Sequence, residues 1–247
     1  MRIGLLADLH ANREATEACL LALADAGCTQ FAFLGDLVGY GADPGWVVDC
    51  VREHVAGGAV AVQGNHDAAV DGDLEPAMNE QARVALQWTR DALDADQRRF
   101  LRELPLQVVE EDRLYAHANA FAPGRWAYVY NPLAAGQSLK ATPQWLTLLG
   151  HVHDQAVYYT GATAQAIHFQ PVPGATLPLL PSRRWLAIVG SCGQPRDGNP
   201  AAACAWLDTQ RRQLGFLRVP YDHERAAQKV IAAGLPAVLA QRLLSGR

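Results

Sequence analysis

The chain has 247 residues, of which 50% are hydrophobic and 19% are charged, and its formal net charge is −4. This composition supports a sizeable core and excludes extended disorder, and the acidic balance without a basic run argues against nucleic acid as the main partner. No apolar run reaches the roughly 18 residues of a membrane span, the N-terminal run is too short for a signal peptide, and the cysteines form no Cys-x-x-Cys pair, which together predict a cytoplasmic protein with reduced thiols.

The first part of the chain alternates between apolar runs and helical patterns. Asn12 is placed to cap the first helix, and Pro44 is placed to open the second. Alternation of strand and helix is typical of a partly parallel sheet. The predicted strands span 3–7, 31–34 and 59–63, and the predicted helices span 13–26 and 44–55.

The remainder of the chain is richer in strand patterns. Helices are predicted over 79–93 and from Asp94 to just before Pro105, and residues 118–144 form a loop-rich segment with a short helix from Pro132. The predicted strands are 107–110, 114–117, 145–150, 156–159, 166–169, 184–189, 201–208 and 212–218, and helices follow from about His223.

These elements fit one domain over residues 1–247 that contains two packed sheets. In this interpretation, residues 3–155 carry the functional site. Residues 156–247 then add a β-rich second sheet and the C-terminal helices.

Polar residues follow several of these strands directly. Gly64-Asn65-His66-Asp67 comes after an apolar run, and open α/β sheets bind ligands at the carboxyl ends of their strands. Gly-Asn also forms ordinary turns, so this stretch alone decides nothing. Four other strand ends carry residues of the same kind, and the full set is Asp8 and His10, Asp36, Asn65 and His66, His117, and His151 with His153.

Five of the eight histidines therefore lie at strand ends. A single histidine would be read as an ordinary packed or surface residue, but this concentration predicts a metal site. Asp8 and His10 are two residues apart, as are His151 and His153, so on an extended chain each pair faces one way. Imidazole mixed with carboxylate suits Mn²⁺, Fe, Zn²⁺, Ni²⁺ or Co²⁺ better than Ca²⁺ or Mg²⁺ alone.

The ordered blocks resemble those of the calcineurin-like metallophosphoesterases. The blocks are Asp8-x-His10, Gly35-Asp36-x-x-Gly39, Gly64-Asn65-His66-Asp67, His117 and Gly150-His151-x-His153. The segment 190–198 is similar to one in the small bacterial and archaeal branch related to diadenosine tetraphosphatases and phosphodiesterases. With the strand and helix pattern, the resemblance implies an α/β fold: a four-layer αββα sandwich of two packed mixed sheets flanked by helices.

The resemblance also implies roles for these residues. It implies two divalent transition-metal ions, with manganese the first expectation, that activate a bridging hydroxide for attack on phosphorus. His66 would protonate the leaving oxygen, and Asp67 would orient His66. The first ion would be held by Asp8, His10, Asp36 and His153, and the second by Asp36, Asn65, His117 and His151.

Candidate substrate contacts are Arg196, Asn12 and Tyr40. Tyr40 stands where the protein Ser/Thr phosphatases have a phosphate-binding arginine, which argues against that activity. Arg196 could supply the missing phosphate contact or belong to a surface turn. Asn12 could contact substrate or only cap a helix, and Tyr40, Asn119 and Tyr128 could shape a nucleotide pocket or only pack.

The resulting hypothesis is a hydrolase that acts on a phosphodiester, a phosphomonoester or a dinucleoside polyphosphate. The alternative is a catalytically inactive metal-binding scaffold for protein interaction, which should have lost ligands or the general acid. All seven ligand positions and His66 are present, so the sequence favours the enzyme. A nuclease would need a basic groove. The sequence leaves the oligomeric state open.

Overall fold

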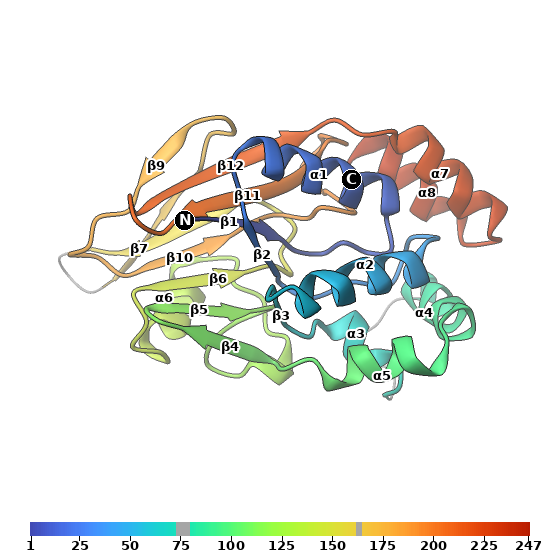
Figure 1. Ribbon diagram of the computed structural model, residues 1–247, viewed down its shortest axis with the longest axis horizontal. Coiled ribbons are helices and arrows are strands. Elements are labelled where there is room, and N and C mark those ends of the chain that lie inside the picture. The colour runs from blue at the N-terminus through green and yellow to red at the C-terminus, as the bar shows by residue number, and fades with distance from the viewer. Residues whose placement is uncertain (73–79, 162–164) are drawn as a thin grey trace.

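The computed structural model describes residues 1–72, 80–161 and 165–247, and two mixed sheets dominate it (Figure 1). The first sheet has the strand order β3 (Val60–Ala61), β2 (Gln30–Phe33), β1 (Arg2–Leu6), β11 (Ala202–Asp208), β12 (Gln213–Val219) and β9 (Thr176–Pro178). The second has the order β4 (Gln107–Glu110), β5 (Arg113–Ala116), β6 (Leu146–Leu149), β10 (Trp185–Ile188), β7 (Ala156–Thr160) and β8 (Ala166–Phe169).

Both sheets combine parallel and antiparallel pairs. β1, β2 and β3 are parallel, whereas β11 runs antiparallel to β1. β5, β6 and β10 are parallel, whereas β4 and β7 run antiparallel to their neighbours. Because β9, β11 and β12 join the first sheet, residues 156–247 do not form a sheet of their own, and that part of the prediction is wrong.

The two sheets pack against each other through apolar side chains. Leu5, Tyr115, Leu148 and Phe216 belong to one buried cluster that draws on both sheets. Alternation along each strand directs such residues to the inner face, and their removal from water supplies most of the favourable folding energy. This packing holds the carboxyl ends of β1, β2, β5 and β6 at the same end of the sandwich.

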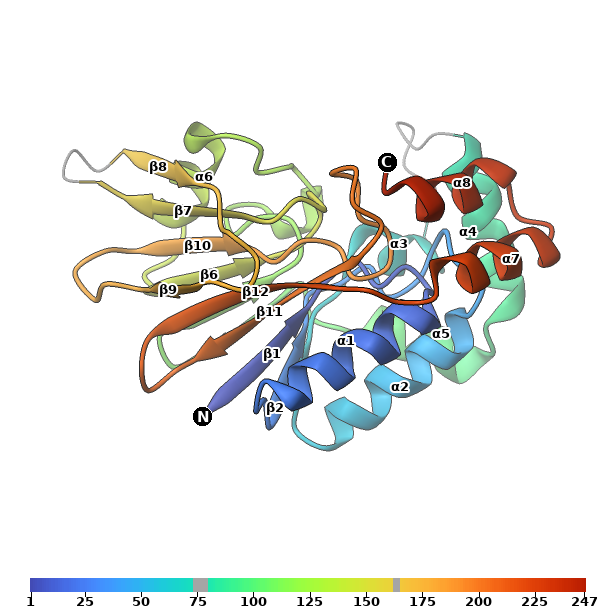
Figure 2. The same cartoon turned by 90° about the horizontal axis from the view of Figure 1, so that it is seen from above.

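Helices cover the outer faces and complete four layers (Figure 2). α1 (Arg13–Asp25) and α2 (Pro44–Ala56) pack on the first sheet, where Leu23 and Val48 share a buried cluster with Phe33. α6 (Pro132–Lys140) covers the second sheet, where Leu139 packs with Ile188. The predicted αββα sandwich is confirmed.

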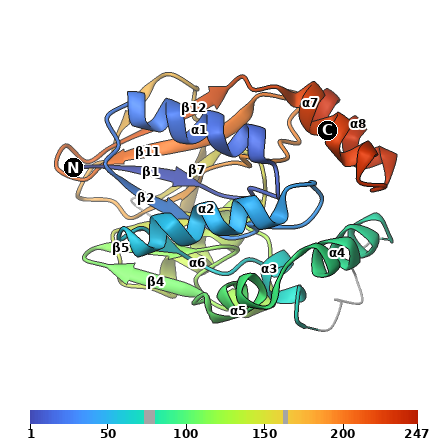
Figure 3. The ribbon, with the colours of Figure 1, turned by 45° about the vertical axis from the view of Figure 1, so that its right-hand side comes forward.

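Further helices gather at the end of the sandwich toward which β1 and β2 point (Figure 3). α7 and α8 pack against each other and, with α4 and Tyr40, form a separate buried cluster. No helix in the described part of the chain is long and apolar enough to span a membrane. The helices at this end of the sandwich are α3 (Asn65–Ala69), α4 (Glu80–Ala92), α5 (Ala95–Glu103), α7 (His223–Ala232) and α8 (Ala237–Ser245). The chain also has a 3-10 turn at Pro123–Arg125.

Most predicted elements agree with the structure to within one or two residues. Two were missed: α3, which begins at Asn65, and β9 at the sheet edge. Both are too short to show a hydrophobic period in the sequence. The predicted helix 79–93 begins outside the described residues and is observed from Glu80. The interpretation of residues 1–247 as one domain stays a prediction.

Candidate metal centre

The predicted ligands converge where the strand ends of the two sheets meet. They follow β1, β2, β5 and β6, and Asn65 stands at the start of α3 just beyond β3. Six of the seven are buried and Asn65 is half-buried. The seven are Asp8, His10, Asp36, Asn65, His117, His151 and His153.

Two compact groups of donor atoms form within this set. In the first, Asp8 Oδ1 lies 3.5 Å from His153 Nε2, which lies 3.2 Å from His10 Nε2. In the second, His117 Nε2 lies 3.4 Å from Asp36 Oδ2 and 3.0 Å from His151 Nδ1. The donor atoms within each group lie within 4.8 Å of one another, which suits coordination of one cation by each group.

Asp36 connects the two groups. Its Oδ2 lies 3.4 Å from His117 Nε2 and 3.9 Å from His10 Nε2. Its Oδ1 accepts a hydrogen bond of 2.8 Å from the backbone N–H of His66. Asn65 Oδ1 lies 3.2 Å from His117 Nε2 and adds a fourth donor to the second group. The carboxylate therefore faces both groups, as the predicted bridging role requires.

Backbone carbonyl groups fix the orientation of four histidine rings. A carbonyl oxygen only accepts, so the ring nitrogen that contacts it must carry a proton, and when the ring is neutral the other nitrogen presents a lone pair to the centre. This arrangement is typical of metal-bound histidines. The donating atoms and their acceptors are His10 Nδ1 to Val38 (3.2 Å), His117 Nδ1 to Leu34 (2.7 Å), His153 Nδ1 to Gln194 (2.6 Å) and His151 Nε2 to Trp126 (2.9 Å).

Burial and charge set the protonation of this centre. Burial lowers the pKa of His10 and His153 well below the usual range, and burial together with His117 lowers the pKa of His151 to about 3. Burial also raises the pKa of Asp8 to about 7. Burial opposes the charge on His117, but the adjacent Asp36 carboxylate outweighs it and raises the pKa of His117 to about 9.

The backbone at these positions is turned rather than extended. Among the described residues, ten non-glycine residues have positive φ, and six of them are predicted site residues. Such conformations cost about 1–3 kcal/mol each and cluster at functional sites. The expectation of extended Asp-x-His and His-x-His segments was therefore wrong, although the side chains still converge. The six are Asp8, His10, Asp36, Tyr40, His151 and His153.

Two glycines permit close approach of these loops. A Cβ on Gly64 would lie 2.1 Å from the Asp36 backbone nitrogen. A Cβ on Gly39 would lie 2.5 Å from His66 Nδ1, and Gly39 also has φ of +88°. Any larger residue at either position would push His66 or Asp36 away from the centre.

His66 lies beside the ligands, with a ring nitrogen within 4.8 Å of donor atoms of His10 and Asp36. Its ring is 4% exposed and lies 5.1 Å from the ring of His10 and 4.5 Å from that of Tyr40. Its Nδ1 is buried and has no hydrogen-bond partner among the described residues. His66 thus differs from the four carbonyl-anchored histidines, and its ring is free to face a ligand.

We expected Asp67 to contact the His66 ring, but its carboxylate contacts backbone N–H groups instead. Its Oδ1 accepts from the backbone N–H groups of Leu37 and Val38, at 2.8 and 3.2 Å, and its Oδ2 accepts from Gly64 at 2.9 Å. Asp67 therefore holds together the two loops that carry Asp36 and His66. This positions the His66 backbone rather than its imidazole.

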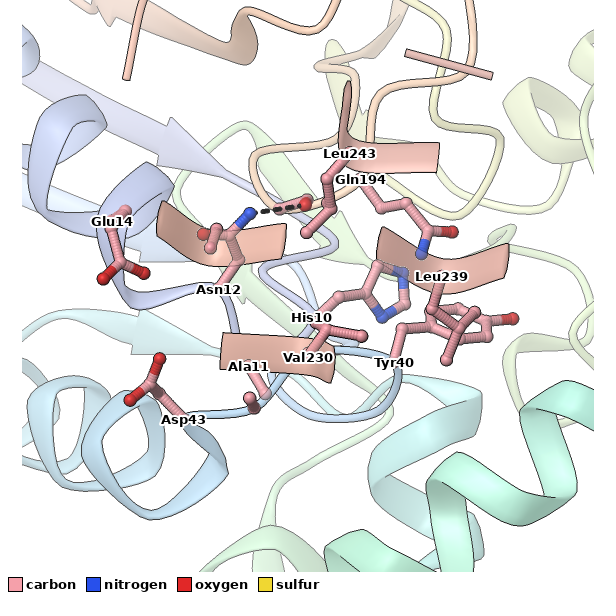
Figure 4. Close-up of a pocket in the computed structure, with 14 residues that line it drawn as sticks. His10, Ala11, Asn12, Glu14, Tyr40, Asp43, Gln194, Val230, Leu239 and Leu243 are labelled. Atoms are coloured by element: carbon pink, nitrogen blue, oxygen red, sulfur yellow. Dashed lines mark hydrogen bonds between the residues drawn. The ribbon is translucent and has the colours of Figure 1, made fainter. Parts of the chain in front are cut away.

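Asn12 caps α1 and faces the protein interior. Its Oδ1 accepts from the Ala15 backbone at 3.1 Å, and its Nδ2 donates to the Gly193 carbonyl at 2.8 Å (Figure 4). The cavity that it lines has a volume of about 10 Å³, which admits no more than a water molecule. We therefore assign Asn12 to helix capping, and its predicted substrate contact is not supported.

Tyr40 and Arg196 adjoin the centre in different ways. Tyr40 is 8% exposed, and its ring packs 4.7 Å from the ring of His10, so it forms a wall of the site. Arg196 is exposed, donates a hydrogen bond of 3.0 Å to Gln194 and lies 5.8 Å from the centre of the Tyr40 ring. Its guanidinium therefore lies beside the Tyr40 wall of the site. A substrate contact by either residue remains a prediction.

Two contributors could not be found from residue types. Trp126 and Gln194 act through backbone carbonyls, which every residue possesses. Tyr128 stacks on the ring of the ligand His151, with ring centres 3.9 Å apart. Unlike the two carbonyl groups, Tyr128 was indicated by the sequence, as a residue that could shape a nucleotide pocket within the aromatic cluster that follows β5.

Comparisons with known proteins agree with this geometry. The family model of the calcineurin-like phosphoesterase superfamily domain matches residues 1–212. The chain is 30% identical over 250 residues to the uncharacterised protein MJ0912 of Methanocaldococcus jannaschii, with 99% of this chain and 98% of the relative covered. It is 34% identical to a metallophosphoesterase of Sphaerobacter thermophilus, whose crystal structure superposes with a TM-score of 0.89 over 100% of this chain and 99% of the other.

More distant structures share the fold. The hypothetical protein PH1004 of Pyrococcus horikoshii superposes with a TM-score of 0.78 at 16% identity, and the match covers 100% of this chain and 98% of that protein. A putative diadenosine tetraphosphatase gives a TM-score of 0.52, also at 16% identity, over 89% of this chain and 94% of the other. At these identities the similarity concerns the fold alone.

Proposed function

This chain belongs to the calcineurin-like phosphoesterase superfamily and is a metal-dependent phosphoesterase, and we propose that it uses two divalent transition-metal ions to hydrolyse small phosphate esters. The observation that carries this proposal is the pair of donor groups that share Asp36. The first ion would be held by Asp8, His10, Asp36 and His153, and the second by Asp36, Asn65, His117 and His151.

The donor set fits such ions. Four imidazoles with lone pairs directed inward, two carboxylates and one amide oxygen suit manganese, iron, zinc, nickel or cobalt, and we propose manganese first. When bound, a pair of cations neutralises phosphate oxygens and acidifies a water for attack on phosphorus. Asp36 would keep the two groups at a fixed separation, because its carboxylate is tied to the His66 backbone at 2.8 Å.

His66 is the proposed proton donor to the leaving group. Its ring is buried, its Nδ1 has no partner among the described residues, and burial lowers its pKa. A phosphate anion beside the ring favours the protonated form, so substrate binding would load the proton. The ring would then deliver it to the leaving oxygen as the bond to phosphorus breaks. Asp67 would act through the backbone that it holds.

Arg196 would bind a phosphate oxygen at the open side of the site. A guanidinium recognises phosphate with paired N–H donors, and this one extends from the loop whose Gln194 carbonyl fixes His153. The alternative, an inactive scaffold, would have no reason to retain, beside a complete ligand set, a buried histidine whose Nδ1 has no hydrogen-bond partner in the described part of the chain. We therefore favour hydrolysis of a phosphodiester, phosphomonoester or dinucleoside polyphosphate.

A hydrolysis screen tests the proposal. Purified protein is stripped with chelator, reloaded with Mn²⁺, Ni²⁺, Co²⁺, Zn²⁺ or Fe²⁺, and assayed on bis-p-nitrophenyl phosphate, p-nitrophenyl phosphate, dinucleoside polyphosphates and a phosphoprotein. We expect turnover of the small esters only after reloading, with close to two metal ions per chain by elemental analysis. Metal binding without turnover of any ester would favour the scaffold, and one ion per active chain would exclude the two-metal mechanism.

A further inference from the structure

An exposed aromatic stack extends outward from the metal centre. The ring of Tyr128 lies parallel to that of His151, with centres 3.9 Å apart and an interplanar angle of 15°. The ring of Tyr130 continues the stack, with its centre 4.7 Å from that of Tyr128 and an angle of 14°. Tyr128 is 43% exposed and Tyr130 is 62% exposed. A ligand of the metal centre is thus the first layer of a stack that ends in an open tyrosine face.

The segment that carries the stack is anchored. Val129, between the two tyrosines, is fully buried against the second sheet and α6. Val129 is buried while the residues on either side of it are exposed, so both tyrosines face outward. Asn119 closes the preceding loop with hydrogen bonds to the backbone of Ala122 and Ala127, at 2.7 and 2.9 Å. The tyrosines are therefore presented by a braced backbone and contribute little to the core.

Arg196 links the stack to the centre. Its guanidinium carbon lies 5.8 Å from the centre of the Tyr40 ring, which packs 4.7 Å from the ring of His10 in the first donor group. The cationic group thus lies at the edge of the centre, and its charge opposes the rise in pKa that burial causes at Tyr128 and Tyr130. A ligand with an anionic group at the centre and a flat ring at the stack would contact both Arg196 and the exposed ring of Tyr130.

We propose that Tyr130, backed by Tyr128, is a stacking surface for the nucleobase of a nucleotide ester whose phosphate is bound at the metal centre. The inference rests on the proposed phosphoesterase function and specifies its substrate class. Base stacking on an exposed aromatic ring is worth about 1–3 kcal/mol and requires no particular base, because every base has a flat face. The site would therefore prefer nucleotide esters over alkyl esters, with little discrimination among bases.

A nucleobase fits this position better than a phenyl leaving group. Two ring-to-ring steps, of 3.9 and 4.7 Å, separate Tyr130 from the ligand His151. A phenyl ring bonded directly to a phosphate oxygen stays next to the metal centre, whereas the sugar of a nucleotide carries its base farther away.

Two chromogenic diesters that differ only in the nucleoside test the inference. Thymidine 5′-(p-nitrophenyl phosphate) and methyl p-nitrophenyl phosphate release the same nitrophenolate. Tyr130→Ala should raise KM for the thymidine ester by about 5- to 100-fold, as expected from the loss of one stacked base, and should leave the methyl ester unchanged. Tyr130→Phe, which keeps the ring, should behave as wild type, and so should Phe169→Ala, which removes an exposed aromatic side chain from β8.

A binding measurement separates this inference from the proposed function. Calorimetry compares thymidine 5′-monophosphate with methyl phosphate on the metal-loaded protein, and wild type should bind the nucleotide more tightly while Tyr130→Ala should not. If neither diester is hydrolysed, the proposed function fails, and the binding difference alone decides the stacking surface. Equal losses on both diesters, no change in KM, or equal binding of the two phosphates by wild type would overturn the inference.

Discussion

The metal centre and its outer rim are built in opposite ways. The centre consists mostly of buried side chains on five strand-end loops, and four of its histidine rings are locked by backbone carbonyls at 2.6–3.2 Å. The rim, which we define as Arg196, Tyr128 and Tyr130, is exposed and held mainly by the backbone that carries it. Rigidly held donor atoms would keep the reacting phosphate in one geometry. An exposed rim can instead contact the part of the substrate that differs from one ester to another.

The contrast also concerns where strain is tolerated. Asp8, Asp36 and His151 adopt positive φ inside the centre, where packing and hydrogen bonds from both sheets hold them. Neither rim tyrosine nor Arg196 has positive φ. Substitutions in the centre should therefore affect metal binding, chemistry and stability together, whereas substitutions in the rim should affect substrate affinity alone.

The largest effect is expected from Asp36→Asn, which removes the anionic donor shared by both groups. Even changes beside metal ligands commonly cost about 10- to 100-fold, so turnover should fall by more than about 100-fold, and metal content should fall with it. Elemental analysis and turnover with bis-p-nitrophenyl phosphate check this. Asp25→Asn, at an exposed carboxylate on α1, is the control. Full metal content with normal turnover would show that Asp36 does not bridge.

A large effect confined to chemistry is expected from His66→Gln. Metal content should stay normal, because His66 is not among the proposed ligands, while turnover of alkyl esters should fall by about 10²- to 10⁴-fold. The loss should be smaller for aryl esters, because nitrophenolate leaves without a proton. His168→Gln, at an exposed histidine in β8, serves as the matched control. Equal losses for both ester types would assign His66 to phosphate binding instead.

Metal binding should depend on pH through two groups of the centre. In the metal-free protein the pKa of Asp8 is raised to about 7 by burial, and that of His117 to about 9 by Asp36 against burial. Both groups must lose their protons to bind a cation, so affinity should weaken as the pH falls through 9 and again through 7.

Calorimetry in buffers of different ionisation enthalpy measures this effect. It should record release of about one proton per chain at pH 8 and close to two near pH 6.5. The pKa values of Asp8 and His117 are higher in the metal-free folded protein than in the unfolded chain. The metal-free fold is therefore more stable at low pH and loses this stability as the pH rises through the two folded-state pKa values. The metal-induced rise in Tm should therefore grow from pH 6.5 to pH 9. A Tm rise and proton count independent of pH would contradict these assignments.

The smallest effect is expected from Asn12→Ala, because Asn12 lies beside the centre but serves as the cap of α1. Loss of a helix N-cap costs about 0.5–2 kcal/mol of unfolding free energy, whereas KM should be unchanged, because Asn12 contacts only the protein. Asn131→Ala, at the N-cap of α6, removes an exposed cap away from the centre and should cost less, because buried Asn12 also donates to the Gly193 carbonyl. Urea unfolding and KM are the measurements, and a raised KM for Asn12→Ala alone would restore its predicted substrate contact.

The sequence alone identified a large part of the centre. Seven ligand candidates and His66 could be selected because each follows a predicted strand, and strand ends in such sheets meet at one edge. Strands and helices were located by local hydrophobic period, which depends on neighbours in the chain. For the same reason the short α3 and β9 escaped prediction, and extended backbone was wrongly assumed at His10 and His153.

Only the tertiary structure decided the long-range contacts. It paired β11 with β1 and placed the Asp67 carboxylate against the backbone N–H groups of Leu37 and Val38. It also directed the Asn12 side chain to the Gly193 carbonyl in the interior. It also stacked Tyr128 and Tyr130 on His151. Residue type fixes which chemistry a side chain can perform, but partners far apart in the chain meet only when the sheets pack. The sequence thus determined the chemistry of the centre, and the packing determined its geometry and its rim.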